Sequence, residues 1–279
     1  MIDFCHITPT AFIPEFFFEE EPRTHLVLAH LIEEDSEYRN QYNFLAANDH
    51  EIIMDNSAFE MYKRKQPMYP TEKLIQMAIA CQASYVVMSD YPGEDWLKTV
   101  HAAEKMIPQL KEAKLGTFYC PQSLPGDVDG LVDSFKWGLS NPDIDYIAFS
   151  ILNIPLAYGC ESNNPIQKYL SRLHFMNRLE DEGLLPGLLG KKVHFLGMTE
   201  GPNEISLMRG FTDFIDTWDS SAAVWAGLNG IKFDNSPTGL FQGKFAKEVD
   251  FDYKVGDNLR LAKENINYIE ELCLSLIHI

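Results

Sequence analysis

The segment Glu51–Glu60, EIIMDNSAFE, predicts the fold, because a short apolar run ends directly on a carboxylate. Continuous apolar runs of this length are typical of strands that are buried on both faces of a parallel sheet. In a parallel barrel the loops after the strands form the active site, so polar residues at strand ends are candidate site residues. Three other segments have the same form: SYVVMSDYP (Ser84–Pro92), LGTFYCPQS (Leu115–Ser123) and TDFIDTWDSS (Thr212–Ser221). We therefore expect an enzyme, with first candidate residues Asp55, Asp90, Gln122 and Asp219.

Candidate strands and helices alternate along the chain. The expected strands are 25–29, 51–54, 85–88, 116–120, 146–151, 193–197 and 214–218, and the expected helices are 71–82, 94–114, 128–139, 165–182, 202–211 and 257–274. This alternation predicts a parallel sheet with right-handed crossovers. Residues 230–233 are a poor candidate for the eighth strand. With 279 residues, close to the roughly 250 of such barrels, we expect a single-domain (β/α)8 TIM barrel over residues 1–279.

The composition fits a folded enzyme that does not enter the membrane. Hydrophobic residues make up 46% of the chain at a mean hydropathy of −0.18, and no segment supplies the roughly 18 uninterrupted apolar residues of a membrane span. The first 23 residues place acids beside aromatic residues and lack the basic start of a secretory signal, so we expect a cytoplasmic protein, in the host cytoplasm if a phage encodes it. Residues 275–279, of native or foreign origin, are given no role.

The net charge of −18 bears on the partners that the protein binds. Proteins that bind a phosphate backbone usually present a basic face, so this charge argues against nucleic-acid binding unless the cations cluster. Lys63, Arg64 and Lys65 form a cluster directly after the Asp55 loop, and a solvated surface run is the alternative interpretation. The five cysteines are scattered without a C-x-x-C pair, which predicts free thiols and no zinc knuckle. We expect no metal and no cofactor.

The loop after the expected strand 51–54 has residues that suit a ligand site. Asn56, Ser57 and Ala58 are small residues that let a ligand approach the backbone closely, and Phe59 is placed to lie over a planar ring. The alternative is that Asp55 only caps a turn, because Asp, Asn and Ser are favourable turn residues.

Four further polar residues lie in or after the later strands. Asp90 has the same two interpretations as Asp55, and the amide of Gln122 is able to donate and accept toward the edge of a heterocycle. Asp216 and Asp219 lie three residues apart, so in a strand they point to opposite faces and only one faces the barrel mouth. We favour Asp219. Two carboxylates that converge on one pocket support a displacement at a sugar carbon, with one as nucleophile and one moving protons.

Five motifs in order carry a resemblance to a known family. MDNSAF, VVMSD, FYCPQ, VHFLG and FIDTWDSSAAVWAGLNG resemble the motif series of tRNA-guanine transglycosylases, especially the archaeal type, and of the related DNA deazaguanine transglycosylases of phages and bacterial DNA-modification clusters. The resemblance covers residues 51–233. It implies a (β/α)8 barrel that exchanges a guanine in nucleic acid for a 7-deazaguanine base.

The resemblance also implies roles for individual residues. Asp219 matches the aspartate that attacks C1′ and holds the covalent intermediate, and Asp55 matches the acid/base for the leaving and entering bases. The expected base-binding residues are Asp90 and Gln122, which hydrogen-bond the ring, Phe59, which stacks on it, and Ser57, Leu196 and Gly197 of the pocket.

Two departures from the family pattern bear on the substrate. The tRNA enzymes carry a zinc site of three cysteines and a histidine, whereas only Cys273 and His278 follow Asp219 here. They also usually show a Gly-Gly pair after the fifth strand, where this chain has Ala148–Ser150. This chain therefore resembles the compact DNA-acting branch more closely. The expected partners are DNA and a free 7-deazaguanine base, and a homodimer is possible because enzymes of the family often dimerise.

Three alternatives stay open at this point. The first is the same base exchange on tRNA, and the second is a barrel that binds a nucleobase or a protein without catalysis. The third is a metal-dependent hydrolase, although the sequence shows no clustered histidine pattern.

Overall fold

Eight parallel strands form one sheet in the order β1-β8-β7-β6-β5-β4-β3-β2. The computed structural model describes residues 2–161, 164–198, 201–236 and 248–275. The strands are β1 (Asp3–His6), β2 (Thr24–Leu28), β3 (Glu51–Asp55), β4 (Tyr85–Val87), β5 (Gly116–Tyr119), β6 (Tyr146–Ser150), β7 (Lys192–Leu196) and β8 (Thr217–Ser220). No ladder joins β1 to β2 in the described residues, but Asp3 Oδ2 accepts a hydrogen bond from the Thr24 N–H at 2.8 Å. The strands therefore form a nearly closed (β/α)8 barrel.

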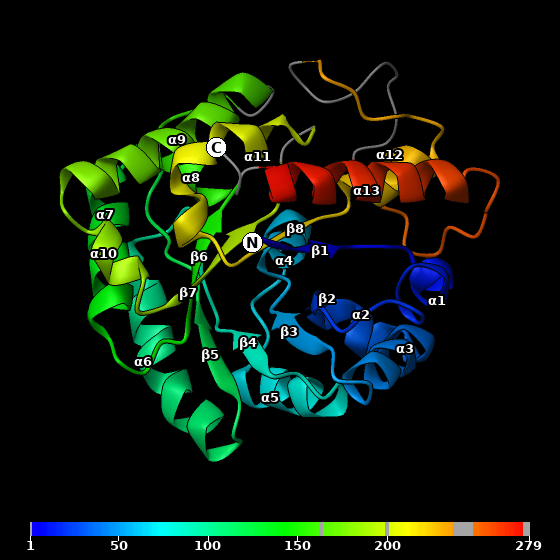
Figure 1. The fold of residues 1–279 in the computed structure, drawn as a ribbon. Helices are drawn as coiled ribbons and strands as arrows, with labels where there is room; N and C mark the ends of the chain where they lie inside the picture. The colour runs from blue at the N-terminus through cyan, green and yellow to red at the C-terminus, as the bar shows by residue number, and fades with distance from the viewer. Residues whose placement is uncertain (1, 162–163, 199–200, 237–247, 276–279) are drawn as a thin grey trace.

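Most of the helices surround the strands on the outside, whereas α4 (Ala58–Arg64) lies over the middle of the ring of strands in this view (Figure 1). The helices are α1 (Ile13–Phe17), α2 (Ala29–Glu34), α3 (Ser36–Ala46), α4 (Ala58–Arg64), α5 (Thr71–Ala80), α6 (Trp96–Glu112), α7 (Val128–Ser140), α8 (Asn153–Ala157), α9 (Pro165–Asp181), α10 (Leu185–Leu188), α11 (Asn203–Leu207), α12 (Ala222–Leu228) and α13 (Leu259–Ser275), with short 3₁₀ turns η1 (Thr10–Phe12) and η2 (Arg209–Phe214). No described helix is both long enough and apolar enough to cross a membrane.

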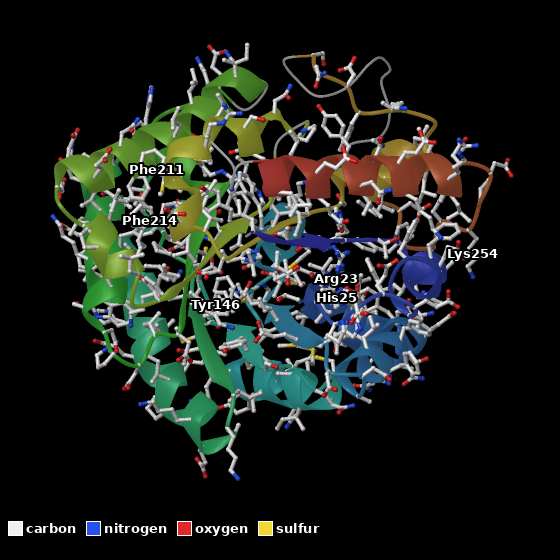
Figure 2. The ribbon with its side chains drawn as sticks, in the orientation of Figure 1. Arg23, His25, Tyr146, Phe211, Phe214 and Lys254 are labelled. Carbon is white, nitrogen blue, oxygen red and sulfur yellow. The ribbon has the colours of Figure 1, made fainter. Side chains whose placement is uncertain are left out.

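The barrel interior is filled by side chains from alternate strand positions, as the period of two in a strand requires. Its apolar part is a cluster of buried residues: Cys5, Ile7, Leu26, Ile53, Val87, Phe118, Cys120, Tyr146 and Ala148. Tyr146 lies within the ring of strands, where its ring stacks on Phe118 at 5.1 Å between centroids (Figure 2). At the amino-terminal end of the strands, Glu51 pairs with Lys192 at 3.1 Å and accepts from the Tyr146 hydroxyl at 3.2 Å. Polar contacts therefore fill this end.

The second core lies between the strands and the helices, and α13 completes it. This helix packs across α12 and β1 (Figure 1). A Cβ atom at Gly227 of α12 would lie 2.3 Å from Ala262 Cα of α13, so only glycine permits this approach. The carboxyl-terminal helix is therefore part of the barrel wall.

Most of the expected strands are confirmed, but the eighth strand is not the expected one. The strand that the sequence analysis did not predict is β1, at the start of the chain. It is only four residues long and pairs with β8, from Asp3 opposite Thr217 to His6 opposite Ser220. Residues 230–233 are not a strand, and the Phe233 N–H instead donates to Asn265 Oδ1 of α13 at 2.9 Å. The expected helix at 202–211 is divided into α11 and η2. Of the terminal segment that was set aside, residues 276–279 lie outside the described residues.

Candidate active site

The carboxylate of Asp219 lies at the carboxyl end of β8 and is buried. Two nitrogen atoms bond to the same oxygen, Oδ1: His194 Nε2 at 3.0 Å and the Gly197 N–H at 2.8 Å. With the proton on Nε2, the His194 ring donates to Asp219, and its Nδ1 accepts from the Thr217 hydroxyl at 2.6 Å. Nothing else in the described part of the chain bonds to this carboxylate. Both donors bind Oδ1, so among the described residues Oδ2 has no hydrogen-bond partner.

Gly197 takes a backbone conformation that its site requires. Its φ of 72° lies in the left-handed region, and a Cβ atom there would meet Ile151 Cγ2 at 2.5 Å. Glycine avoids both penalties, which allows the chain to turn after β7 and aim the N–H at Asp219. The expected pocket residue Gly197 therefore holds the candidate nucleophile, while Leu196 packs beneath it against the barrel interior.

Asp55 is the last residue of β3, and its carboxylate accepts fewer hydrogen bonds than that of Asp219. Its Oδ2 accepts one hydrogen bond, from the Ser57 N–H at 2.9 Å. Ser57 has a φ of 58°, an uncommon conformation for a residue other than glycine. Its hydroxyl bonds to both the backbone N–H and the ring Nδ1 of His30, at 3.2 and 2.9 Å. Ser57 thus faces His30 within the turn.

Other carboxyl groups surround Asp55. Burial raises its pKa well above the usual value, and the negative charges of Glu60, Asp90 and Asp219 raise it further. Glu60 of α4 also has a raised pKa, mainly through burial, and its Oε2 atom is buried without a hydrogen-bond partner. Asp55 and Asp219 lie at the carboxyl ends of β3 and β8, and Asp90 follows β4, so the three lie at one mouth of the barrel. Burial and the neighbouring charges favour a proton on Asp55.

Asn56, Asp90 and Gln122 form a hydrogen-bonded network beside Asp55. Asn56 Nδ2 donates to Asp90 Oδ1 at 2.7 Å, and Gln122 Nε2 donates to Asp90 Oδ2. Burial raises the pKa of Asp90 to about 6, although these donors oppose the rise. Asp90 and Gln122 are therefore brought together, as expected, but they bind one another. A ligand that used both groups would have to replace their shared hydrogen bond.

A cavity of about 690 Å³ lies next to this network. Ser89 and Tyr91, the neighbours of Asp90, line it together with the segment before α5 and the first turns of α6. Pockets that hold small molecules span about 300–1,000 Å³. The volume lies in this range, but Asp55, Asp90, Gln122 and Asp219 are not among the residues that line the cavity.

The expected stacking residue and the expected cation cluster lie on α4. Phe59 is exposed, and Lys63 Nζ lies 4.3 Å from its ring centroid. Lys63 also pairs with Glu248 at 2.5 Å, and Arg64 pairs with Glu34 at 3.9 Å. Lys65 ends the helix with a φ of 53° and has no ion pair in the described residues. Acids therefore partly neutralise this cluster.

Asp216, the alternative to Asp219, lies at the other end of the barrel. Its Oδ2 accepts from the Val193 N–H at 2.7 Å, near the start of β7. The two aspartates are thus separated by the ends of the barrel and not by the faces of one strand, because β8 begins only at Thr217.

Sequence reasoning missed several residues of the mouth, which are His30, Asn56 as a ligand of Asp90, Glu60, Arg172, His194 and Glu204. The histidine in VHFLG was a signal for His194, because period two from Leu196 places it on the inner face. Nothing in the sequence marked Arg172, because it lies in mid-helix far from every motif. No group of three or more potential metal ligands is found among the described residues.

Comparisons with known proteins bear on the fold alone. No protein-family model matches the chain, and no curated protein matches its sequence. Triosephosphate isomerase from Bartonella henselae is 16% identical, with 80% of this chain and 93% of that chain covered and a TM-score of 0.41. A D-tagatose 3-epimerase-like protein is 12% identical, with 99% and 98% covered and a TM-score of 0.49. D-Psicose 3-epimerase from Clostridium cellulolyticum H10 is 8% identical, with 90% and 89% covered and a TM-score of 0.42. We draw no conclusion on function from them.

Proposed function

We propose that this protein is a base-exchange glycosyltransferase that replaces guanine in DNA with a 7-deazaguanine derivative. The observation that carries the proposal is the contrast between two carboxyl groups at one barrel mouth. Asp219 receives two N–H donors on one oxygen, whereas Asp55 receives one and lies among acids that raise its pKa. Paired carboxyl groups whose surroundings differ in this way divide the roles of nucleophile and proton carrier.

The first half of the reaction breaks the bond to guanine. The target nucleotide must leave the base stack to enter the mouth, with Phe59 at its edge. Asp219 Oδ2 attacks C1′, and the electron pair of the glycosidic bond leaves with guanine N9. Asp55 delivers its proton to the departing guanine. The product is a glycosyl ester on Asp219, and Asp55 is now charged.

The second half reverses these steps with a different base. The free 7-deazaguanine gives its N9 proton to Asp55, and its N9 attacks C1′. The ester bond breaks, its electrons return to Asp219, and both carboxyl groups regain their starting protonation. No cofactor is consumed. Asp90 and Gln122 supply the acceptor and donor that recognise the edge of either base.

Nucleoside mass spectrometry tests the proposal. DNA and tRNA from cells that express the chain together with a supply of deazaguanine are digested and compared with cells that express Asp219→Asn. A deazaguanine nucleoside in DNA, dependent on Asp219, supports the proposal. The same nucleoside in tRNA alone would transfer the activity to tRNA. A wild-type chain that modifies neither polymer, and exchanges no labelled guanine in vitro, would reduce the barrel to a binding protein.

A further inference from the structure

The loop that holds Asp219 is itself held by a buried arginine. Arg172 lies in α9 and is completely buried. Its Nη2 donates to the Gly197 carbonyl at 2.9 Å, and its Nη1 donates to the carbonyls of Phe149 and Leu196 at 3.0 and 3.2 Å. One guanidinium thus joins the carboxyl ends of β6 and β7.

A buried acid keeps this arginine in place. Arg172 Nε donates to Glu204 Oε1 at 2.6 Å, and neither side chain is exposed. The guanidinium carbon also lies 5.0 Å from the ring centroids of both Phe195 and Trp218. Burying an ion pair carries a large desolvation cost that replacement by apolar residues would avoid, so the pair is weak evidence for a stabilising role alone. Its contacts point to a geometric role.

The contacts lead to Asp219 in two steps. Arg172 holds the Gly197 carbonyl, which also accepts from Trp218 Nε1 at 2.9 Å. The N–H of the same glycine donates to Asp219 Oδ1. The Leu196 carbonyl, which accepts from Arg172 Nη1 at 3.2 Å, lies in the same peptide plane as the Gly197 N–H, so fixing this carbonyl limits the directions in which that N–H can point. The planar fork of arginine supplies several donors in fixed directions, which lysine cannot do.

We propose that Arg172, with Glu204 as its anchor, is a positioning residue that aims the Gly197 N–H at Asp219. This inference rests on the proposed function, because Asp219 is the nucleophile only in that reaction. Arg172 itself does not touch the reacting atoms. A displacement of about 1 Å in a reacting group costs about 100-fold in rate, so loss of the fork should lower kcat by about that factor.

The principal variant is Arg172→Lys, which keeps the charge and removes the fork. Arg178 offers a matched control on the same helix, because it also pairs with acids, Glu182 and Asp129, but on the exposed side. Arg178→Lys should leave exchange unchanged. For Arg172→Lys we expect kcat to fall about 100-fold, while the Kd for DNA and the KM for the free base stay within about threefold of wild type.

A second measurement separates positioning from folding. Amide hydrogen exchange of Gly197 reports its hydrogen bond to Asp219 whatever the activity of the protein. We expect faster exchange at Gly197 in Arg172→Lys and not in Arg178→Lys, with the amides of β2 and β3 as protected internal references. If Arg172→Lys fails to fold, Glu204→Gln takes its place in both measurements, because it weakens the anchor of Arg172 and leaves the guanidinium in the protein.

The outcomes distinguish the inference from the function on which it rests. The positioning role alone would be overturned if the wild-type chain performs base exchange and a folded Arg172→Lys variant shows the same kcat and the same protection of the Gly197 amide. A fall in activity that only follows the folded fraction would also overturn it. If the wild-type chain exchanges no base, the proposed function fails, and the catalytic role of Arg172 fails with it.

Discussion

The acids at the two ends of the barrel differ in their surroundings. At the amino-terminal end of the strands, Asp3, Asp145 and Asp216 each accept a backbone N–H from a neighbouring strand, at 2.8, 2.8 and 2.7 Å. At the carboxyl-terminal end, Asp219 also accepts a backbone N–H, from Gly197 at 2.8 Å, but burial raises the pKa of both Asp55 and Asp90. The charges of Asp90 and Asp219 raise the pKa of Asp55 further.

This difference separates stability from function within one residue type. Carboxylates that replace missing ladder partners stabilise the sheet, and in TIM barrels this end carries stability. Carboxyl groups that raise the pKa of a neighbour cost folding free energy, which is typical of sites that perform acid–base chemistry.

The largest expected effect is the difference between the variants Asp219→Asn and Asp216→Asn. Asp219→Asn should abolish base exchange and covalent trapping of DNA on the protein, because an amide does not attack C1′. Asp216→Asn should retain exchange and lose only about 1 kcal/mol of stability, since it weakens one hydrogen bond. Trapping on denaturing gels and urea unfolding measure the two effects. Trapping retained in Asp219→Asn but lost in Asp216→Asn would reverse the assignment.

Asp55 should affect the rate without affecting binding. Asp55→Asn removes the proton carrier, and general acid–base groups contribute about 10²–10⁴-fold, so we expect turnover to fall within that range. The Kd for DNA should change little. Single-turnover kinetics with fluorescence anisotropy measure both quantities. Wild-type turnover in this variant would leave Asp55 as a turn cap.

Asp90 should make stability depend on pH in a defined direction. Its pKa rises from the usual 3.8 to about 6 on folding, so the folded protein binds a proton more tightly than the unfolded chain. This stabilising contribution is complete below pH 3.8 and disappears as the pH rises through 6. At pH 7 the buried charge costs on the order of 3 kcal/mol.

The difference between wild type and Asp90→Asn isolates this contribution. Relative to wild type, the variant should be most stable at pH 7, and its advantage should shrink as the pH falls toward 4. Urea unfolding at each pH gives the difference. A constant difference across this range would contradict the raised pKa.

The smallest expected effect concerns the α4 cations. Lys63→Ala, Arg64→Ala and Lys65→Ala combined should weaken DNA binding and flatten its salt dependence, by about 0.9 in slope for each lost phosphate contact. Because Lys63 and Arg64 already pair with acids, we expect a change of about 1 in slope. Lys111→Ala, which breaks a pair with Asp143 near the end of α6, is the control. Equal slopes in both variants would remove α4 from the DNA path.

Much of the architecture was predictable from local pattern. Short apolar runs predicted seven of the eight strands, and four of them supplied the candidate residues Asp55, Asp90, Gln122 and Asp219. These features depend on residues that are adjacent in sequence, and the physics of one strand is enough to infer them.

The rest depended on contacts between distant segments. The four residues of β1 carry no strand signal of their own, and only pairing with β8 makes them a strand. Arg172 lies 25 residues before Gly197, so no local pattern links them. Gln122 looked free to bind a ligand until Asp90 was found beside it. The sequence by itself determined that Asp55, Asp90, Gln122 and Asp219 lie near strand ends, because strand ends are local properties. Only the tertiary structure decided the hydrogen-bond partners and the direction of those side chains, because both depend on the neighbours that folding brings together.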